Sequence, residues 1–417
     1  MSDSIIPKRR TQDRVHRILL ASAIIGIITG LAVAAVANTT EHLFEVLTER
    51  RLVQYVALLP CIGLVLSWVS MRFIGDNATP DTADIYLQKF HGAKYALNFR
   101  RFVARVLGTI GTIGFGGAVG FEGIAMYMGT VFGDTVQKRF PKLLHGFDRR
   151  TLFVAGAAAG VSAVFKAPAT GVVFALEVPY QDDFARSMLL PTMVASASSY
   201  LAYVSISGLN PIFQIHGSPA FSFVDIGGAL ALGVIAGLCA KLFSMGMKVA
   251  KKYSRSTPAY LKLPITGAIL AGIVLLGHQI TGDVNTIGPP YDLFNWLLVP
   301  HRAIGVLVAI LLLRSLAAIT TIAGGGVGGV FIPLVICGAL LGSIFAGVVQ
   351  GSDINLFVIV GIAAFLGAGY RVPLAAVTFI AEATGRPGYI VPGLFAAVMA
   401  DVVMGKSSIT SFQLPAN

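Results

Sequence analysis

Charged residues are scarce in this chain. Only 12% of its 417 residues are charged and 55% are hydrophobic, with a mean hydropathy of +0.77, whereas a soluble domain is about 25% charged. This composition excludes an ordinary soluble protein and predicts an all-α polytopic membrane protein. Residues 18–37 contain no charge for 20 positions, which is about the length that spans a hydrocarbon core.

Cysteine is also rare, and neither cysteine nor histidine forms a pattern of metal ligands. The three cysteines, Cys61, Cys239 and Cys337, lie inside apolar runs, and none of the seven histidines is spaced as a metal-binding pair. We therefore expect small cysteines in the core, no disulfide set, no metal and no other cofactor.

Sequence signatures of enzymes are missing as well. No His-Glu-x-x-His or Gly-x-Ser-x-Gly occurs, and Tyr291-Asp292 has no partner Gly-x-Gly-Asp, so neither an activated nucleophile nor a metal site is indicated. The run from Gly324 to Gly329 formally matches a dinucleotide fingerprint, but no strand precedes it and apolar sequence flanks it. The sequence argues against an enzyme.

The net charge of +11 does not indicate a nucleic-acid partner, because most basic residues lie at the ends of apolar runs. The basic stretch 8–17 precedes the first run and predicts a cytoplasmic N-terminus by the positive-inside rule. Residues 1–38 resemble a signal peptide, but their apolar part is longer than the usual core of one. We expect a retained first helix.

The apolar runs divide the chain into five segments. These are a basic N-terminal tail at 1–16, a first membrane half at 17–250, a connecting loop at 251–262, a second membrane half at 263–405 and a short tail at 406–417. The last segment is too short for a large cytoplasmic regulatory module.

Two stretches of the chain repeat each other. Residues 156–177 return as residues 361–382 at a constant offset, since 361 − 156 and 382 − 177 both equal 205. Upstream, five glycines within 116–133 return within 325–342 at an offset of 209. Matching membrane segments that are interrupted by glycine and proline predict broken helices and a transport site between two halves.

A glutamate enclosed by glycines marks the candidate site of the first half. Glu122 stands in Gly120-Phe121-Glu122-Gly123 inside an apolar segment, where a charge at the bilayer centre costs about 2.5–3.5 kcal/mol. A helix that starts at this point would direct its positive end at this carboxylate or at an anion. A glutamate that competes with an anion for one position acts as a gate. The alternative is a glutamate at the membrane surface.

The equivalent segment of the second half is Gly329-Val330-Phe331-Ile332-Pro333. Pro333 suits the first turn of a helix, which would leave the N–H groups of residues 330–332 free to bind an anion. Glu122 and Phe331 are equivalent, since 331 − 122 equals 209. Two helix starts are therefore predicted to converge from opposite halves.

The remaining intramembrane charges occupy repeated places. Lys166 and Arg371 shortly precede equivalent prolines, and Glu177 and Glu382 end equivalent helices. We interpret them as structural caps and anchors rather than site residues. Small residues four apart in the repeated glycine segments are typical of helix packing.

Two other membrane classes compete with an anion transporter. A cation or sugar transporter with inverted repeats would bind its substrate with carbonyls and paired carboxylates, whereas both helix starts here present amides. A purely structural membrane protein gives no reason for Glu122.

These motifs resemble those of the CLC family of chloride channels and chloride/proton exchangers. Gly120-Phe-Glu122-Gly123-Ile is similar to the family's Gly-(Arg/Lys)-Glu-Gly-Pro, and Gly329-Val-Phe331-Ile-Pro333 matches its Gly-x-Phe-x-Pro. The resemblance covers about residues 14–413. It implies the CLC fold of two inverted-topology repeats with broken and re-entrant helices. It also implies a homodimer in the lipid bilayer of the bacterial inner membrane, with one anion pathway per subunit.

The same resemblance implies the roles of individual residues. Glu122 is the gating residue, and the anion-binding residues are Phe121, Glu122, Gly123, Gly329, Val330, Phe331, Ile332, Pro80 and Thr410.

The chain departs from the family pattern at both hydroxyls expected beside the central anion. Where the family has Gly-Ser-Gly-Ile-Pro, this chain has Thr79-Pro80-Asp81-Thr82, and either Pro80 or Asp81 aligns with the serine. Within the resemblance, a proline there is linked to nitrate preference, and an aspartate would repel anions. Thr410 falls near the family's C-terminal tyrosine and is expected to donate in its place.

Proton coupling is the open question. Exchangers of the family carry an internal glutamate directly after a first one, whereas this chain has Glu177-Val178, and channels of the family commonly have valine there. Glu177 lies about 100° around the helix from that position. We therefore expect transport of chloride-type anions that is gated by Glu122 and is channel-like or weakly proton-coupled. The alternative is a stoichiometric proton/anion antiporter, with a preference for a non-chloride anion such as nitrate.

Overall fold

The computed structural model describes residues 5–49, 51–92, 97–141, 147–148, 150–181, 183–213, 215, 221–288, 291–298, 302–349 and 353–414. The described part of the chain is helical and contains no β-strand beyond isolated bridges, as predicted. The first eight α-helices are α1 (Ile5–Thr48), α2 (Val53–Val69), α3 (Ala83–Phe90), α4 (Phe99–Gly114), α5 (Glu122–Arg139), α6 (Thr151–Phe165), α7 (Pro168–Glu177) and α8 (Leu189–Ser207).

A second set of eight helices follows. They are α9 (Phe223–Ser256), α10 (Ala259–Thr281), α11 (Tyr291–Leu297), α12 (Ile304–Ala323), α13 (Phe331–Val348), α14 (Ile354–Tyr370), α15 (Pro373–Thr384) and α16 (Ile390–Met404). Single turns of π- or 3₁₀-helix precede or follow some of them, at Ser70–Ile74, Arg186–Met188 and Pro387–Tyr389.

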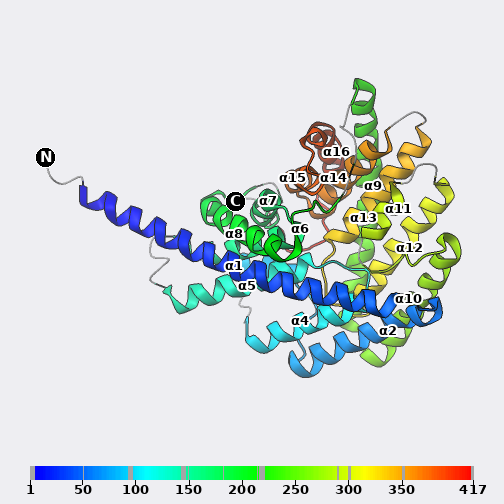
Figure 1. Cartoon of the computed structure of the whole chain (residues 1–417), viewed down its shortest axis with the longest axis horizontal. Helices are drawn as coiled ribbons and strands as arrows, with labels where there is room; N and C mark the ends of the chain where they lie inside the picture. The colour runs from blue at the N-terminus through cyan, green and yellow to red at the C-terminus, as the bar shows by residue number, and fades with distance from the viewer. Residues whose placement is uncertain are drawn as a thin grey trace.

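The contacts between helices repeat with a shift of eight. In the first set α5 packs on α6, α6 on α7 and α8, and α1 on α6 and α8. In the second set α13 packs on α14, α14 on α15 and α16, and α9 on α14 and α16. In Figure 1, α1 runs along α6 and α8, and α9 lies by α14 and α16.

This repeat divides the chain earlier than the sequence suggested. Because α9 packs with the second set, the boundary between the halves falls at 208–222, between α8 and α9. The predicted connection at 251–262 is mostly helical. The non-helical connection between α9 and α10 consists of Thr257 and Pro258 only.

Equivalent turns lead into the two helix starts that the sequence pairs. Gly116 and Gly325, which differ by 209, have φ angles of +85° and +88°, a conformation that glycine adopts without a steric cost. The next glycine in each turn donates to the carbonyl of a threonine five residues earlier, at 2.8 and 2.9 Å. The repeat predicted from the glycine offsets is therefore present in the backbone geometry.

Glycines also let α5 and α6, and likewise α13 and α14, touch backbone to backbone. A Cβ on Gly129 would collide with the carbonyl oxygen of Gly156, and a Cβ on Gly338 would lie 2.5 Å from that of Gly361. Small residues allow this close approach. The predicted packing role of the glycine spacings is confirmed.

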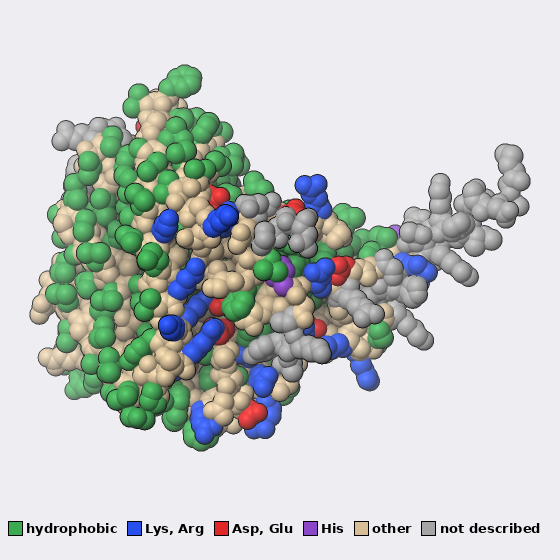
Figure 2. Space-filling model, turned by 180° about the vertical axis from the view of Figure 1, so that it is seen from behind, with side chains coloured by type: hydrophobic (Ala, Val, Ile, Leu, Met, Phe, Trp, Pro, Cys, Tyr) green, Lys and Arg blue, Asp and Glu red, His purple; other side chains and the backbone are tan. Residues whose placement is uncertain are grey.

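Eight helices among the described residues are long and apolar enough to cross a membrane. Four shorter apolar helices, α6, α7, α14 and α15, hold equivalent places in the two halves, as expected of broken helices buried in protein. Figure 2 shows hydrophobic side chains over much of one face, with Lys and Arg gathered in a band. The first helix is part of this body, since Ile18, Ile25 and Val33 are buried.

Candidate functional site

The carboxylate of Glu122 lies at the start of a helix from the other half. Glu122 is the first residue of α5 and is 2% exposed. Its Oε1 accepts a 2.5 Å hydrogen bond from the backbone N–H of Phe331, the first residue of α13. Its Oε2 has no hydrogen-bond partner among the described residues. Because N–H groups of a first helical turn lack partners within the helix, the carboxylate occupies a place suited to a small anion.

Glycines bring the two helix starts together. Gly120 and Gly329 pair like residues of antiparallel strands, with N–H···O distances of 2.9 and 2.7 Å. A Cβ on either glycine would collide with the Glu122 carboxylate, and one on Gly123 would collide with the Thr82 hydroxyl. The N–H of Gly329 is thus already bonded, so Gly329 contributes close approach rather than a free donor. The predicted convergence of residues 121–123 with 329–332 is present.

An aromatic cluster closes one side of this site. The Phe331 ring lies 4.2 Å from that of Phe165, 5.0 Å from Phe379 and 5.5 Å from Phe174, measured between ring centroids. These rings come from α6, α15 and α7. They keep water from this side of the carboxylate, and electrostatic interactions are stronger in such an apolar environment.

A cavity lies on the α3 side of the two helix starts. Its lining includes Pro80, Thr82, Gly329, Val330 and Tyr370. Thr82 is buried, and its hydroxyl donates to the carbonyl of Gly328 at 3.4 Å. Tyr370 is buried, and its ring lies 6.5 Å from that of Phe331, measured between ring centroids.

A fully buried arginine on α4 fixes the loop that carries Pro80 and Thr82. Arg105 donates to the carbonyl oxygens of Thr79 and Asp81, each at 2.9 Å, and to the Tyr127 hydroxyl at 3.2 Å. Hydrogen bonds from a charged donor are stronger than neutral ones. The loop therefore has a defined position beside the cavity.

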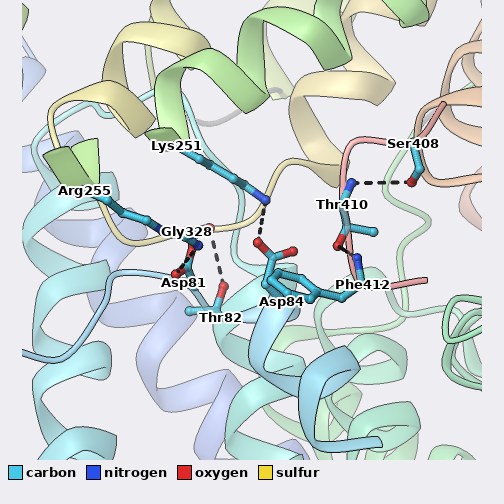
Figure 3. A network of polar contacts seen from close by, with 9 residues as sticks. All are labelled: Asp81, Thr82, Asp84, Lys251, Arg255, Gly328, Ser408, Thr410 and Phe412. Carbon is cyan, nitrogen blue, oxygen red and sulfur yellow. Dashed lines mark hydrogen bonds and ion pairs between the residues drawn. The ribbon is translucent and has the colours of Figure 1, made fainter. Parts of the chain in front are cut away.

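Two ion pairs stand at the opening of the cavity and join the two halves. Asp84 in the first turn of α3 contacts Lys251 of α9 at 2.7 Å, and Asp81 contacts Arg255 at 2.8 Å (Figure 3). Negative charge is favourable at a helix N-terminus and positive charge at a C-terminus, and α3 begins where α9 ends. The bases neutralise two aspartates that would otherwise repel an anion.

Two buried threonines, Thr82 and Thr410, lie at the cavity or next to a residue that lines it. The Thr82 hydroxyl, two residues after Pro80, lies beside Gly123. Thr410 is buried, but its hydroxyl accepts a hydrogen bond from the N–H of Phe412 at 3.3 Å (Figure 3), and its neighbour Ile409 lines the cavity.

Sequence reasoning missed Tyr370 and the pairing of Asp84 with Lys251. A signal for Tyr370 existed, because it is the repeat equivalent of Phe165 (370 − 165 = 205). The ion pairs left no such signal, since their partners are 167 and 174 residues apart.

The charges at repeated positions are caps, as predicted. Glu177, at the end of α7, accepts from the N–H groups of Leu374 and Ala375 in the first turn of α15. Glu382, near the end of α15, accepts from the N–H groups of Ala169 and Thr170 in the first turn of α7. Each half therefore caps a helix of the other.

The same holds for the repeated bases. Lys166 and Arg371 end α6 and α14 with φ angles of +47° and +56°. Lys166 also donates to the carbonyl of Ser207 at 3.0 Å.

Comparison with known proteins decides the family. A family model described as voltage gated chloride channel matches residues 62–405, which is well over half of the chain. The chain belongs to this CLC family. Family membership and the apolar helices together make this CLC protein an integral membrane protein.

Curated relatives of this CLC protein are exchangers by name. The chain is 24% identical over 404 residues to the H(+)/Cl(-) exchange transporter ClcA of Yersinia pestis, an alignment that covers 93% of this chain and 84% of the relative. It is 24% identical over 413 residues to the ClcA of Vibrio parahaemolyticus, with 93% and 86% covered. These relatives support anion transport and give no support to the expectation that transport is channel-like.

Solved structures confirm the CLC fold. A CLC-type fluoride/proton antiporter superposes with a TM-score of 0.81 at 22% identity, covering 96% of this chain and 98% of the other. A slow cyanobacterial Cl−/H+ antiporter gives a TM-score of 0.79 at 20% identity, with 93% and 94% covered.

Proposed function

We propose that this CLC protein is a proton-coupled anion antiporter in which Glu122 competes with the transported anion. The observation that carries the proposal is the hydrogen bond from the Phe331 N–H to the Glu122 carboxylate, made between the two halves. An ionised Glu122 holds the start of α13, whereas a protonated one loses its charge attraction to the amides and leaves the place to an anion. One position is thereby shared by an anion and a proton-binding group.

We propose stoichiometric antiport, the alternative in the sequence analysis, in place of the channel-like or weakly coupled transport expected there. The expectation rested on Val178, but the named relatives are proton exchangers, and the titratable side chains of Asp84 and Tyr370 line the cavity beside the two helix starts. In this proposal the anion is held by backbone N–H groups of Phe121, Glu122, Gly123, Val330, Phe331 and Ile332. The hydroxyl of Thr82 takes the part expected of Pro80 or Thr410.

Chloride is the anion we expect. Thr82 supplies beside Gly123 a hydroxyl that Pro80 lacks, so a nitrate preference inferred from Pro80 alone is not required. Competition by nitrate and fluoride against chloride uptake into vesicles tests this choice. Stronger inhibition by nitrate than by unlabelled chloride would contradict it.

Assembly and orientation follow from the family resemblance. We infer a homodimer with one pathway per subunit, in a bacterial inner membrane with the N-terminus in the cytoplasm. Light scattering of the detergent-solubilised protein and protease access to the N-terminus in sealed inverted vesicles test these two points.

The function is tested by recording both ions at once. The purified protein is reconstituted into vesicles with a chloride gradient, and external chloride and pH are followed with electrodes. We expect chloride efflux to drive proton uptake against a proton gradient at a fixed ratio, and a protonophore to abolish the pH signal. Chloride efflux without proton movement would contradict antiport and favour the channel-like interpretation.

A further inference from the structure

Two carboxylates, those of Asp81 and Asp84, line the cavity beside the two helix starts. Asp84 is buried, and it lines the cavity together with Val330 and Tyr370. It also lines an outer groove, the basic groove, whose charged residues on α9 are Lys248, Lys251, Lys252 and Arg255. Of the two carboxylates, Asp84 is the one that touches both the groove and the cavity, whose wall includes Gly329, a neighbour of the Glu122 carboxylate. An anion pathway has no need of a carboxylate there.

Tyr370 lines the cavity together with Asp84 and packs beside Phe331, whose backbone N–H binds Glu122. Its ring is 3% exposed and packs against those of Phe174 and Phe331. A hydroxyl both donates and accepts a proton, so Tyr370 supplies a polar step in an aromatic wall. The equivalent residue of the first half, Phe165, has no hydroxyl.

The other acid near this wall is already occupied. Both oxygens of Glu177 accept backbone N–H groups of α15, at 3.2 and 2.9 Å. The next residue, Val178, is apolar and 2% exposed. Asp81 also lines the cavity but does not line the basic groove, so Asp84 is the carboxylate placed to exchange a proton with the groove.

Lys251 connects Asp84 with the anion. Its Nζ pairs with Asp84 at 2.7 Å, and the two side chains are 19% and 7% exposed. An anion that arrives through the basic groove competes with Asp84 for this flexible ammonium group. A buried carboxylate left without its partner is costly as a charge, and a proton removes that cost. Anion arrival and proton uptake then favour each other, as linked binding events do.

We propose that Asp84 takes up and releases the transported proton at the groove end of the cavity, with Tyr370 between it and Glu122, and that Lys251 couples this step to the anion. The proposal rests on the antiport proposed above. The titratable and charged groups around Asp84 are Lys248, Lys251, Lys252 and Arg255 on α9, Asp81 before α3, Tyr370 on α14, Glu122 on α5, and the pair of Lys89 with Asp134 at the far end of α3.

The test compares two neighbouring aspartates in the vesicle assay described above. We expect Asp84→Asn to lower the proton-to-chloride ratio by about tenfold or more, because a positioned proton-transfer group is lost, while chloride flux stays within about threefold of wild type. Asp84→Glu should restore at least half of the ratio. Asp81→Asn is the matched control, since it breaks the equivalent pair with Arg255 and should keep the wild-type ratio.

Each outcome decides the proposal. An unchanged ratio in Asp84→Asn, or an equal loss in Asp81→Asn, would overturn the role of Asp84 and leave antiport standing. Wild-type protein that moves no protons would overturn both. If Asp84→Asn does not fold, the double variant Asp84→Asn/Lys251→Gln replaces it, because it strands no buried charge, and the same loss is expected.

A further readout separates proton transfer from a structural role. In wild type, raising chloride on the groove side should increase the proton flux in parallel. In Tyr370→Phe the proton flux should fall by more than the chloride flux. A parallel fall of both fluxes in Tyr370→Phe would overturn the proposed relay through its hydroxyl.

Discussion

The contacts between α7 and α15 are the same in both directions, whereas those between α5 and α13 are not. At α7 and α15, Glu177 caps one helix and Glu382 caps the other, so each half gives and receives the same contact. At α5 and α13, Glu122 of the first half caps the start of α13, and its equivalent Phe331 returns no carboxylate. Helices α7 and α15 thus cap each other, whereas α5 caps α13 and receives no carboxylate cap in return.

This difference distinguishes carboxylates with a structural role from one with a functional role. A carboxylate that both halves carry holds the halves together, and both of its oxygens are used. Glu122 appears once and leaves Oε2 without a partner among the described residues. Buried polar groups are rarely left unpaired without a reason. In a duplicated transporter, the break in symmetry marks the site.

The largest effect is expected from Glu122→Gln. Glutamine keeps the shape but does not change its charge with pH, so proton flux should fall about 10²-fold and chloride flux should become independent of pH. Parallel chloride and pH recordings measure both. Glu382→Gln is the control, because it removes a carboxylate that also caps a helix start of the other half and should leave coupling unchanged. A pH-dependent chloride flux in Glu122→Gln would contradict the gate.

A smaller effect is expected from Gly329→Ala. The added Cβ would collide with the Glu122 carboxylate and displace it from the Phe331 amide. Loss of one hydrogen bond to a charged group costs about 1.5–3 kcal/mol, so the gate should open more readily and its pH dependence should shift. Gly272→Ala, where a Cβ meets nothing within 4 Å, is the control. Equal pH profiles of the two variants would contradict the close approach.

The symmetric glutamates should affect stability rather than coupling. Glu177→Gln and Glu382→Gln each weaken charged hydrogen bonds to a helix start, at about 1.5–3 kcal/mol. Glu382→Gln should cost more, because this carboxylate also accepts the Thr170 hydroxyl. Thermal unfolding in detergent measures the difference. A lower proton-to-chloride ratio in either variant would contradict a purely structural role.

The smallest effect is expected from Thr82→Val, which removes a hydroxyl and keeps the volume. The hydroxyl makes a long 3.4 Å bond to Gly328, so stability should change little. The preference for chloride over nitrate should fall by about fivefold, the value of one neutral hydrogen bond. Bi-ionic flux in vesicles measures the ratio. Thr410→Val is the comparison, because Thr410 is the other hydroxyl expected at the site. A larger fall in Thr410→Val than in Thr82→Val would contradict the role proposed for Thr82.

The sequence predicted those parts of the fold that the duplication repeats. The offset of 209 placed Glu122 opposite Phe331, and the structure brings the two helix starts together. The glycine spacings likewise predicted helix packing, which the structure shows as backbone contact between α5 and α6. Such features can be recognised in the sequence because the same pattern occurs once in each half.

Features that occur in only one half could not be predicted from the repeat. The pairing of Asp84 with Lys251 depends on how α3 meets α9, and no local pattern encodes that distance. The boundary between the halves was misjudged because the basic residues near 251 suggested a loop, whereas they lie on the last turns of α9. Pro80 was aligned with the family's serine and has no hydroxyl, and the sequence did not indicate that the hydroxyl of Thr82, two residues later, lies beside Gly123.

The reciprocal capping of α7 and α15 has a consequence for how such a chain could arise. A polypeptide of half this length would carry one such glutamate and one such proline-led helix start. Two copies lying head to tail would satisfy each other's amides with the bonds now made within a single chain. Fusion of two gene copies would then preserve an existing subunit interface and leave either copy free to lose or gain an acid at its ion-binding end.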